Sequence, residues 1–259
     1  MLEIIICLLA GMGAGIGTGL AGMSAAIVIT PMLVIFLDME AFSAIGIALA
    51  SDVIASAVSA YTYGKNKKID IKNSTVMLAS VLFFTILFSW LSSLIPHDTL
   101  GFISIFGTLI LGIKFIAKPI TSTKTSLAGD SKRKKIILSI LCGAIIGAIC
   151  GFVGAGGGVM MLILLTMVFG YELKTAVGTS VFIMTFTALV GSVSHFAIDG
   201  TPNLKVLITC TLSTLVFAKL ASMFANKAPT KILNRVLGAV LLAFGAVMMV
   251  FQIIQNGIF

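Results

Sequence analysis

The sequence predicts an all-α polytopic membrane protein in which eight hydrophobic segments form two four-segment repeats. Hydrophobic residues make up 59% of the 259 residues and charged residues only 10%, against roughly 25% charged in soluble domains. Apolar runs of about 20 residues or more, enough to cross a bilayer, follow one another with short polar breaks. Glycines of the first half also recur at one fixed spacing in the second half. This composition excludes a soluble globular enzyme.

The apolar runs define the eight expected segments in chain order. The first run carries Glu3 and no Lys or Arg ahead of it, unlike a signal peptide, so we expect it to be retained. Only the stretch 121–135, rich in Thr, Ser and Lys, resembles a linker. The segments lie near 2–37, 43–64, 72–94, 98–118, 135–169, 175–198, 203–225 and 232–256.

The glycine spacing indicates an internal duplication. A shift of 132 residues superimposes the Gly-rich opening of the first half on that of the second. We therefore expect a first transmembrane repeat over 1–118, a cytoplasmic linker over 119–134 and a second transmembrane repeat over 135–259. The glycines that coincide are Gly11, Gly15, Gly19, Gly22 and Gly46 with Gly143, Gly147, Gly151, Gly154 and Gly178.

The first segment of each repeat is too long for a single straight crossing. About 35 helical residues would extend about 52 Å, whereas the hydrocarbon core is about 30 Å thick. If each long segment spans once, the repeats are parallel; if each is a re-entrant hairpin, the repeats are inverted. The inverted arrangement puts every Lys and Arg outside the spans on one side, except Lys205. The positive-inside rule therefore favours inverted repeats with both termini outside.

The Gly-rich breaks in the long segments predict an anion site. Gly costs about 1 kcal/mol relative to Ala in a helix, and unwound backbone in a membrane is tolerated where it is covered or lines a wet cavity. Free N–H groups at the start of the next half-helix would attract an anion. Close helix packing is the alternative role for these glycines, and it is the role that we expect for Gly11, Gly15, Gly143 and Gly147. The expected anion-binding residues are Gly154, Ala155, Gly156, Gly157 and Gly158, together with Gly22, Met23 and Ser24.

A polar stripe in the second segment predicts a coupling-ion site. Asp52 lies mid-segment, where an acid costs several kcal/mol unless partnered. Ser56, Ser59 and Tyr63 follow at helical spacing on the same face. We expect Asp52 and Ser56 to serve H⁺ or Na⁺ coupling, the alternative being an acid that only bonds a neighbouring helix.

Hydroxyl and aromatic residues elsewhere give weaker predictions. Ser180 and His195 lie on a similar stripe in the second repeat, and we expect both to contact the substrate; an interfacial imidazole is the alternative for His195. Trp90, Tyr61 and Tyr63, near segment ends, predict interfacial anchors.

The residue pattern argues against other classes of site. The four cysteines lie in apolar runs without metal-ligand or disulfide spacing, and we expect no metal, no cofactor and no catalytic residue. The net charge of +8 comes from short basic clusters beside apolar runs, so no nucleic-acid partner is expected. The sequence leaves open whether the chain forms a homodimer.

The run from Gly143 to Leu165, followed by Ala176-Val177-Gly178-Thr179-Ser180, resembles the signature of the TauE/SafE family of sulfite and organosulfur-anion exporters. The resemblance extends over nearly the whole chain, and His195 followed by Gly200 is similar to a His…Gly step of the family. The first repeat departs from the pattern, with Ser24-Ala25-Ala26 where the family often has glycines. This departure predicts an asymmetric pocket.

The resemblance implies a secondary transporter in the cell membrane that moves a small sulfur-containing anion. The expected mechanism is export of sulfite, thiosulfate or an organosulfonate by alternating access, with Thr179 and Ser180 supplying hydroxyls. An uncoupled channel or facilitator is the first alternative, and a non-transport membrane protein is the second. An intramembrane enzyme is disfavoured, because the sequence has no credible nucleophile–base pair or pair of acids.

Overall fold

The computed structural model describes residues 2–92, 132–153 and 157–229, with isolated positions between 232 and 246. Within these ranges every regular element is an α-helix, which confirms the all-α prediction. Among the described residues, six helices are long and apolar enough to cross a membrane; with the bounds given below, they are α1, α3, α4, α6, α8 and α9. The predicted segment 98–118 and most of 232–256 lie outside the described residues. The helices are α1 (Leu2–Ala21), α2 (Ala26–Leu37), α3 (Ala41–Lys65), α4 (Ile71–Ser92), α6 (Lys132–Val153), α7 (Gly157–Met167), α8 (Leu173–Asp199) and α9 (Leu204–Lys227).

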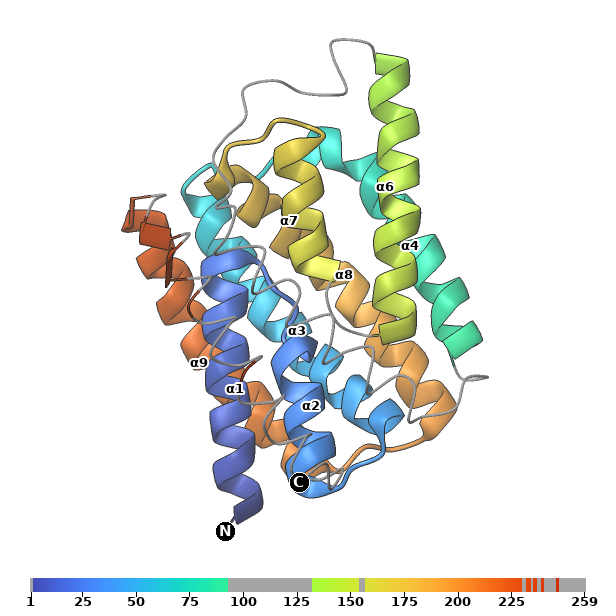
Figure 1. Ribbon diagram of the computed structural model, residues 1–259, viewed down its shortest axis with the longest axis vertical. Helices are drawn as coiled ribbons and strands as arrows, with labels where there is room; N and C mark the ends of the chain where they lie inside the picture. Colours follow the sequence, from blue (N-terminus) through green and yellow to red (C-terminus); the bar gives the residue numbers. More distant parts are fainter. Residues whose placement is uncertain are drawn as a thin grey trace.

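Each long segment is two helices that lie side by side. In Figure 1, α1 begins at the lower end of the molecule and α2 returns toward that end. The chain reverses through Gly22, whose φ of 64° is strained for any residue with a side chain. In the second half, α6 begins at the upper end and α7 returns to it (Figure 1). The two hairpins therefore point in opposite directions.

Glycine seams join each hairpin to a helix of the other half. A Cβ at Gly15 of α1 would lie 2.6 Å from the Thr214 carbonyl oxygen of α9, and one at Gly147 of α6 would lie 2.6 Å from the Phe84 Cβ of α4. These seams leave no room for side chains, so the packing role expected for the N-terminal glycines of each hairpin is confirmed. The full set of seam glycines is Gly11, Gly15 and Gly19 on α1, and Gly143, Gly147 and Gly151 on α6.

The same hydrogen bond stabilises both seams. Ser213 Oγ donates to the Leu8 carbonyl oxygen at 2.8 Å, and Ser80 Oγ donates to the Ile140 carbonyl oxygen at 2.9 Å. Leu8 and Ile140 are separated by the same 132 residues as the glycine pairs. The sequence duplication is thus accompanied by duplicated contacts.

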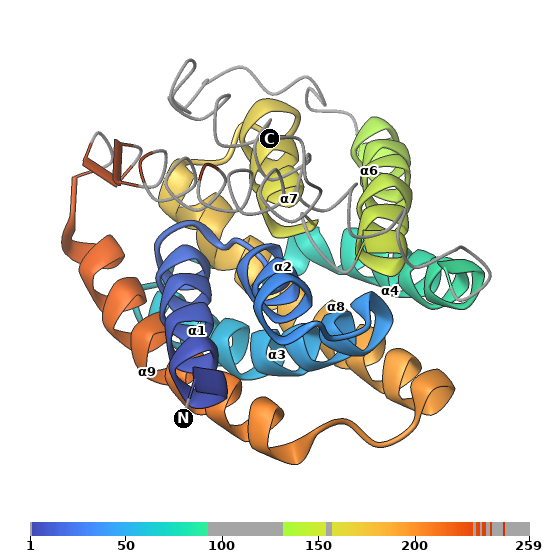
Figure 2. The same ribbon diagram turned by 60° about the horizontal axis from the view of Figure 1, so that its bottom comes forward.

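Helices α3 and α8 run antiparallel through the middle, and α3 lies against both α1 and α2 (Figure 2). The face of α3 that carries the polar stripe is fully covered. Tyr63 is buried and its hydroxyl donates to the Gly19 carbonyl oxygen at 3.1 Å. The prediction that Tyr63 is an interfacial anchor is therefore wrong, because its helix face packs on α1. Trp90 and Tyr61 are 62% and 75% exposed, as anchors would be.

Basic residues gather at the end where α3 finishes and α4, α6 and α8 begin (Figure 1). Two contacts hold this basic end together. Lys174 Nζ, in the first turn of α8, donates to the Asn226 carbonyl oxygen near the end of α9 at 2.7 Å, and Lys68 pairs with Glu172 at 3.5 Å between two connections. The beginning of α1 and the first turn of α9, which contains Lys205, lie at the opposite end (Figure 1). This asymmetry is what the positive-inside rule expects of a cytoplasmic face.

Candidate functional site

The candidate site is centred on Asp52, near the middle of α3. Its side chain is fully buried. Oδ2 accepts a hydrogen bond from Ser24 Oγ at 2.8 Å and Oδ1 accepts one from Ser56 Oγ at 2.9 Å. The backbone N–H of Ala25 donates to the same carboxyl group. Three donors from two elements thus face one buried acid, which is the partnering that an acid inside a membrane needs.

The first helix break supplies two of these donors. Ser24 also stabilises the start of α2, because its Oγ accepts a hydrogen bond from the Ala26 N–H at 3.3 Å. The N–H groups of Gly22 and Met23 donate back to α1 carbonyl oxygens, at 2.9 Å and 3.4 Å. The N–H groups of Gly22 and Met23 are therefore not free to bind an anion, and the Ala25 N–H is used by Asp52.

The start of α7 lies directly against this break. A methyl group at Gly158 would overlap the carbonyl oxygen of Gly22 and the sulfur of Met184, and would lie 3.0 Å from the Ser24 nitrogen. One at Gly157 would overlap Cys150 Sγ on α6. The start of α7 thus meets the first break, and the N-termini of α2 and α7 lie in one region beside Asp52. Helix N-termini carry partial positive charge and favour anions.

A cavity with room for about one water molecule adjoins Asp52. Its walls come from four helices, α3, α4, α6 and α8, and from the first break. The Thr85 hydroxyl in this wall is buried and has no hydrogen-bond partner among the described residues, so the cavity offers an unused polar group. The lining residues are Ser24, Leu49, Asp52, Thr85, Cys150, Met184, Thr187, Ala188 and Gly191.

The three sequence-predicted residues of α8 have different surroundings. Ser180 is beside the site, since a methyl group at Gly22 would overlap its hydroxyl. Thr179 Oγ1 instead accepts a hydrogen bond from the Asp70 N–H at 3.1 Å, directly before the start of α4. His195 stacks on Phe42 with ring centroids 4.2 Å apart. Thr179 and His195 are separated by about 24 Å of helix at about 1.5 Å per residue, so they cannot share one small ligand.

Other predicted residues differ in what can be said of them. Met23 is buried and packs over Gly17 rather than facing the cavity. Gly154, Ala155 and Gly156 lie outside the described residues.

Seven cavity residues were not among the predicted site residues: Leu49, Thr85, Cys150, Met184, Thr187, Ala188 and Gly191. Thr187 lies on the polar stripe of α8, which is a usable signal. Thr85 and Cys150 lie in apolar stretches of α4 and α6, and neither belongs to a predicted motif. Among the described residues, no group of three His, Cys, Asp or Glu side chains could hold a metal ion.

Comparisons with known proteins agree on the class of protein. A family model described as "Sulfite exporter TauE/SafE" matches residues 7–248. "Probable membrane transporter protein YunE" of Bacillus subtilis is 26% identical over 278 aligned positions that cover all of both chains. "Probable membrane transporter protein YdhB" of the same organism is 38% identical over 91 residues, 35% of each chain. "Probable membrane transporter protein MJ0441" of Methanocaldococcus jannaschii is 31% identical over 112 residues, 41% of this chain and 42% of that protein.

Proposed function

We propose a substrate and a mechanism for this chain, which belongs to the sulfite exporter TauE/SafE family and is a multi-pass membrane transporter. The chain carries a small sulfur-containing anion, such as sulfite, thiosulfate or a short organosulfonate, out of the cell by alternating access. The description of the matching family supports this class of substrate.

The two halves of the chain form inverted repeats, each opening with a re-entrant hairpin. The opposite directions of the α1–α2 and α6–α7 hairpins support this arrangement. So do the duplicated bonds from Ser213 to Leu8 and from Ser80 to Ile140. The basic end faces the cytoplasm by the positive-inside rule. Transporters built from inverted repeats bind substrate near the midplane, at broken helices.

The substrate anion binds where the start of α7 meets the first break, next to Asp52. The N-termini of α2 and α7 attract its negative charge. The hydroxyls of Ser24, Ser180 and Thr85 are the polar groups within reach of this point. The pocket has to widen when substrate enters, because the cavity in this conformation admits only about one water molecule. Such widening is expected of an alternating-access cycle.

The contacts of Asp52 support a specific form of coupling, and this observation carries the proposal. Its carboxylate already holds the Ser24 hydroxyl and the Ala25 N–H, which are the donors that a substrate anion at the first tip would use. Two negative charges about 4 Å apart repel by several kcal/mol away from bulk water. Substrate therefore binds when Asp52 is protonated, and one proton travels with each anion.

This coupling is compatible with export. A divalent anion accompanied by one proton carries a net charge of −1. An inside-negative membrane potential drives that charge outward by about 2.3 kcal/mol per 100 mV.

The test is uptake of labelled sulfite, thiosulfate and a short sulfonate into proteoliposomes. We expect saturable uptake of at least one anion, with accumulation when the external solution is more acidic than the lumen. Accumulation driven by a Na⁺ gradient instead would contradict the proton assignment. Gradient-independent equilibration would make the protein an uncoupled facilitator, and absence of uptake of all three anions by folded protein would refute the substrate class.

A further inference from the structure

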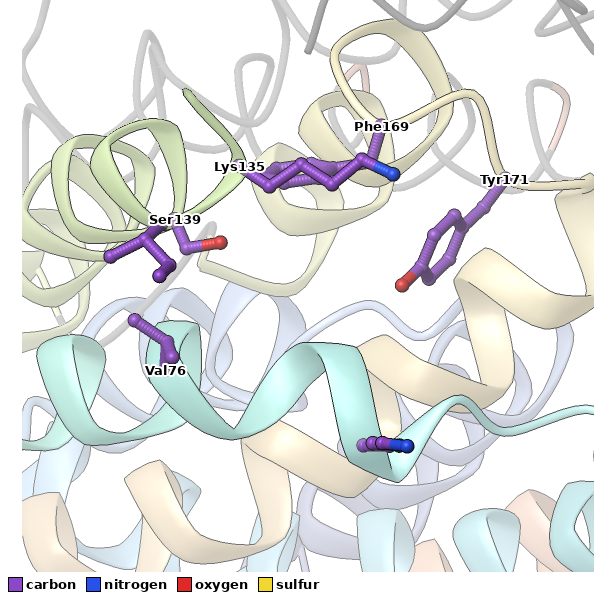
Figure 3. A pocket seen from close by; sticks show the side chains of 7 residues that line it. Val76, Lys135, Ser139, Phe169 and Tyr171 are labelled. Carbon is purple, nitrogen blue, oxygen red and sulfur yellow. The ribbon is translucent and has the colours of Figure 1, made fainter. Parts of the chain in front are cut away.

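A second cavity lies at the basic end, away from Asp52. It is enclosed by the first turns of α4 and α6 and by the connection between α7 and α8, and its volume is about 280 Å³. In Figure 3, Ser139 of α6 lies above Val76 of α4, the Lys135 side chain extends from α6 toward Phe169, and Tyr171 approaches from the connection. The remaining lining residues are Lys72, Ile136 and Phe169.

The cavity is lined by two lysines, Lys72 and Lys135. Within the described ranges, neither Lys72 nor Lys135 has an ion pair or a hydrogen bond from its side chain. Two described acidic residues flank the lining residues in sequence, and each has a partner. Asp70 accepts the Tyr171 hydroxyl at 2.9 Å, and Glu172 pairs with Lys68 at 3.5 Å.

Tyr171 adds no negative charge to this cavity. Burial, followed by the hydrogen bond to Asp70 and the charge of Asp70, raises the pKa of the phenol above its usual range. The phenol therefore stays neutral at physiological pH. The cavity presents two ammonium groups and the Ser139 hydroxyl to whatever enters it.

The rest of the lining is apolar and continues onto the outer face of the protein. Val76, Ile136 and Phe169 form the apolar part of the wall. Beyond it, α6 exposes Ile137, Ile140 and Leu141 at 52%, 45% and 56%. The membrane-spanning parts of α4 and α6 begin at Ser74 and Arg133, so both lysines lie at the level where a span meets the aqueous phase. A ligand that fits has an anionic head and an apolar body.

We propose that this cavity binds the phosphate headgroup of an anionic phospholipid, between Lys72 and Lys135, with the acyl chains lying along the exposed face of α6. Basic pockets between transmembrane helices on the cytoplasmic side recognise such headgroups. A small free oxyanion would satisfy the lysines but would leave the apolar wall without a partner. The mixed lining therefore favours the lipid over a substrate anion on its way to the central site.

Native mass spectrometry of the purified full-length protein tests this proposal. The protein is equilibrated with phosphatidylglycerol or phosphatidylcholine, and retained lipid is counted per chain. The double variant Lys72→Gln/Lys135→Gln removes both cavity charges. Lys65→Gln/Lys134→Gln is the matched control, because both of these side chains are exposed at the same end and neither lines the cavity.

We expect the wild-type protein to retain one phosphatidylglycerol and to prefer it to phosphatidylcholine. At roughly fivefold for each lysine near the headgroup, the double variant should bind it about 30-fold more weakly, while the control stays within about threefold. Equal losses in both double variants would reduce the effect to diffuse attraction by the basic end. Lys72/Lys135-dependent binding of free thiosulfate, with phosphatidylglycerol retention unchanged, would assign the cavity to the substrate anion and overturn the proposal.

Discussion

Replacing Asp52 with Asn separates a coupling acid from a structural one. The amide has nearly the same shape, and its oxygen can still accept from Ser24 or Ser56, while the other hydroxyl can turn to accept from the amide nitrogen. Hydrogen bonds to a charged group contribute about 1.5–3 kcal/mol and neutral ones about 1 kcal/mol. The loss is offset because no charge is buried in the variant. We therefore expect the free energy of unfolding to change by less than about 2 kcal/mol.

The effect on transport should be large by comparison. With one proton carried per anion, a pH difference of one unit supports an accumulation ratio of about ten, because each pH unit is worth about 1.4 kcal/mol. The variant has no titrating group at this position, so its ratio should fall to about one, although anion exchange across the membrane continues.

The assay is thiosulfate uptake into proteoliposomes with the external pH one unit below the internal pH and the membrane potential held at zero. Asp38→Asn is the matched control. Asp38 ends α2 with a φ of 50°, a conformation that Asn adopts readily, and it lies far from the site. Tenfold accumulation by Asp52→Asn, equal to that of the control, would refute the coupling role and leave Asp52 as a structural acceptor.

Four further substitutions test the packing around the site and the basic end. Gly158→Ala should abolish transport and lower the melting temperature, because its methyl group would overlap the backbone of the first break. Gly15→Ala and Gly147→Ala should each lower the free energy of unfolding by about 1–3 kcal/mol, since both seams are overfilled in the same way. Tyr171→Phe should cost about 0.5–1.5 kcal/mol through the lost bond to Asp70. The raised pKa of Tyr171 means that its contribution is complete below about pH 10, the usual tyrosine pKa, and declines as the pH rises further.

Each of these predictions has its own control or contrary result. Gly64→Ala should be tolerated, because only Ile69 Cδ1 lies near, at 3.4 Å; equal loss of transport in both alanine variants would argue against a special role for Gly158. A neutral Gly147→Ala beside a damaging Gly15→Ala would contradict equivalent seams. A stability difference between the wild type and Tyr171→Phe that does not shrink above pH 10 would contradict the neutral phenol.

Features of the fold that follow a regular spacing could be predicted from the sequence, whereas features that depend on tertiary packing could not. The 132-residue glycine spacing predicted the duplication, and the same spacing reappears in the two seams. The stripe from Asp52 to Tyr63 predicted a common helix face, which is buried throughout. Because Tyr63 belongs to that stripe, the same pattern also predicts that it packs inside the protein, and this prediction conflicts with its assignment as an interfacial anchor.

The composition of the site could be predicted only in part. Asp52, Ser56 and Ser24 are found together, because an acid in a membrane segment needs donors and a broken helix offers them. Thr179 and Ser180 are neighbours in sequence but face different partners, since successive residues of a helix point about 100° apart. Thr85 and Cys150 reach the cavity only through the way α4 and α6 pack, which no local pattern encodes.

Proton uptake on anion binding tests the central claim most directly. Detergent-solubilised protein in weakly buffered solution is mixed with thiosulfate, which does not titrate near neutral pH, and the pH change is followed with an indicator. If the anion takes over the donors of Asp52, the wild-type protein takes up about one proton for each anion bound and Asp52→Asn takes up none. Anion binding without proton uptake by the wild type, or with the same uptake by both proteins, would contradict the account.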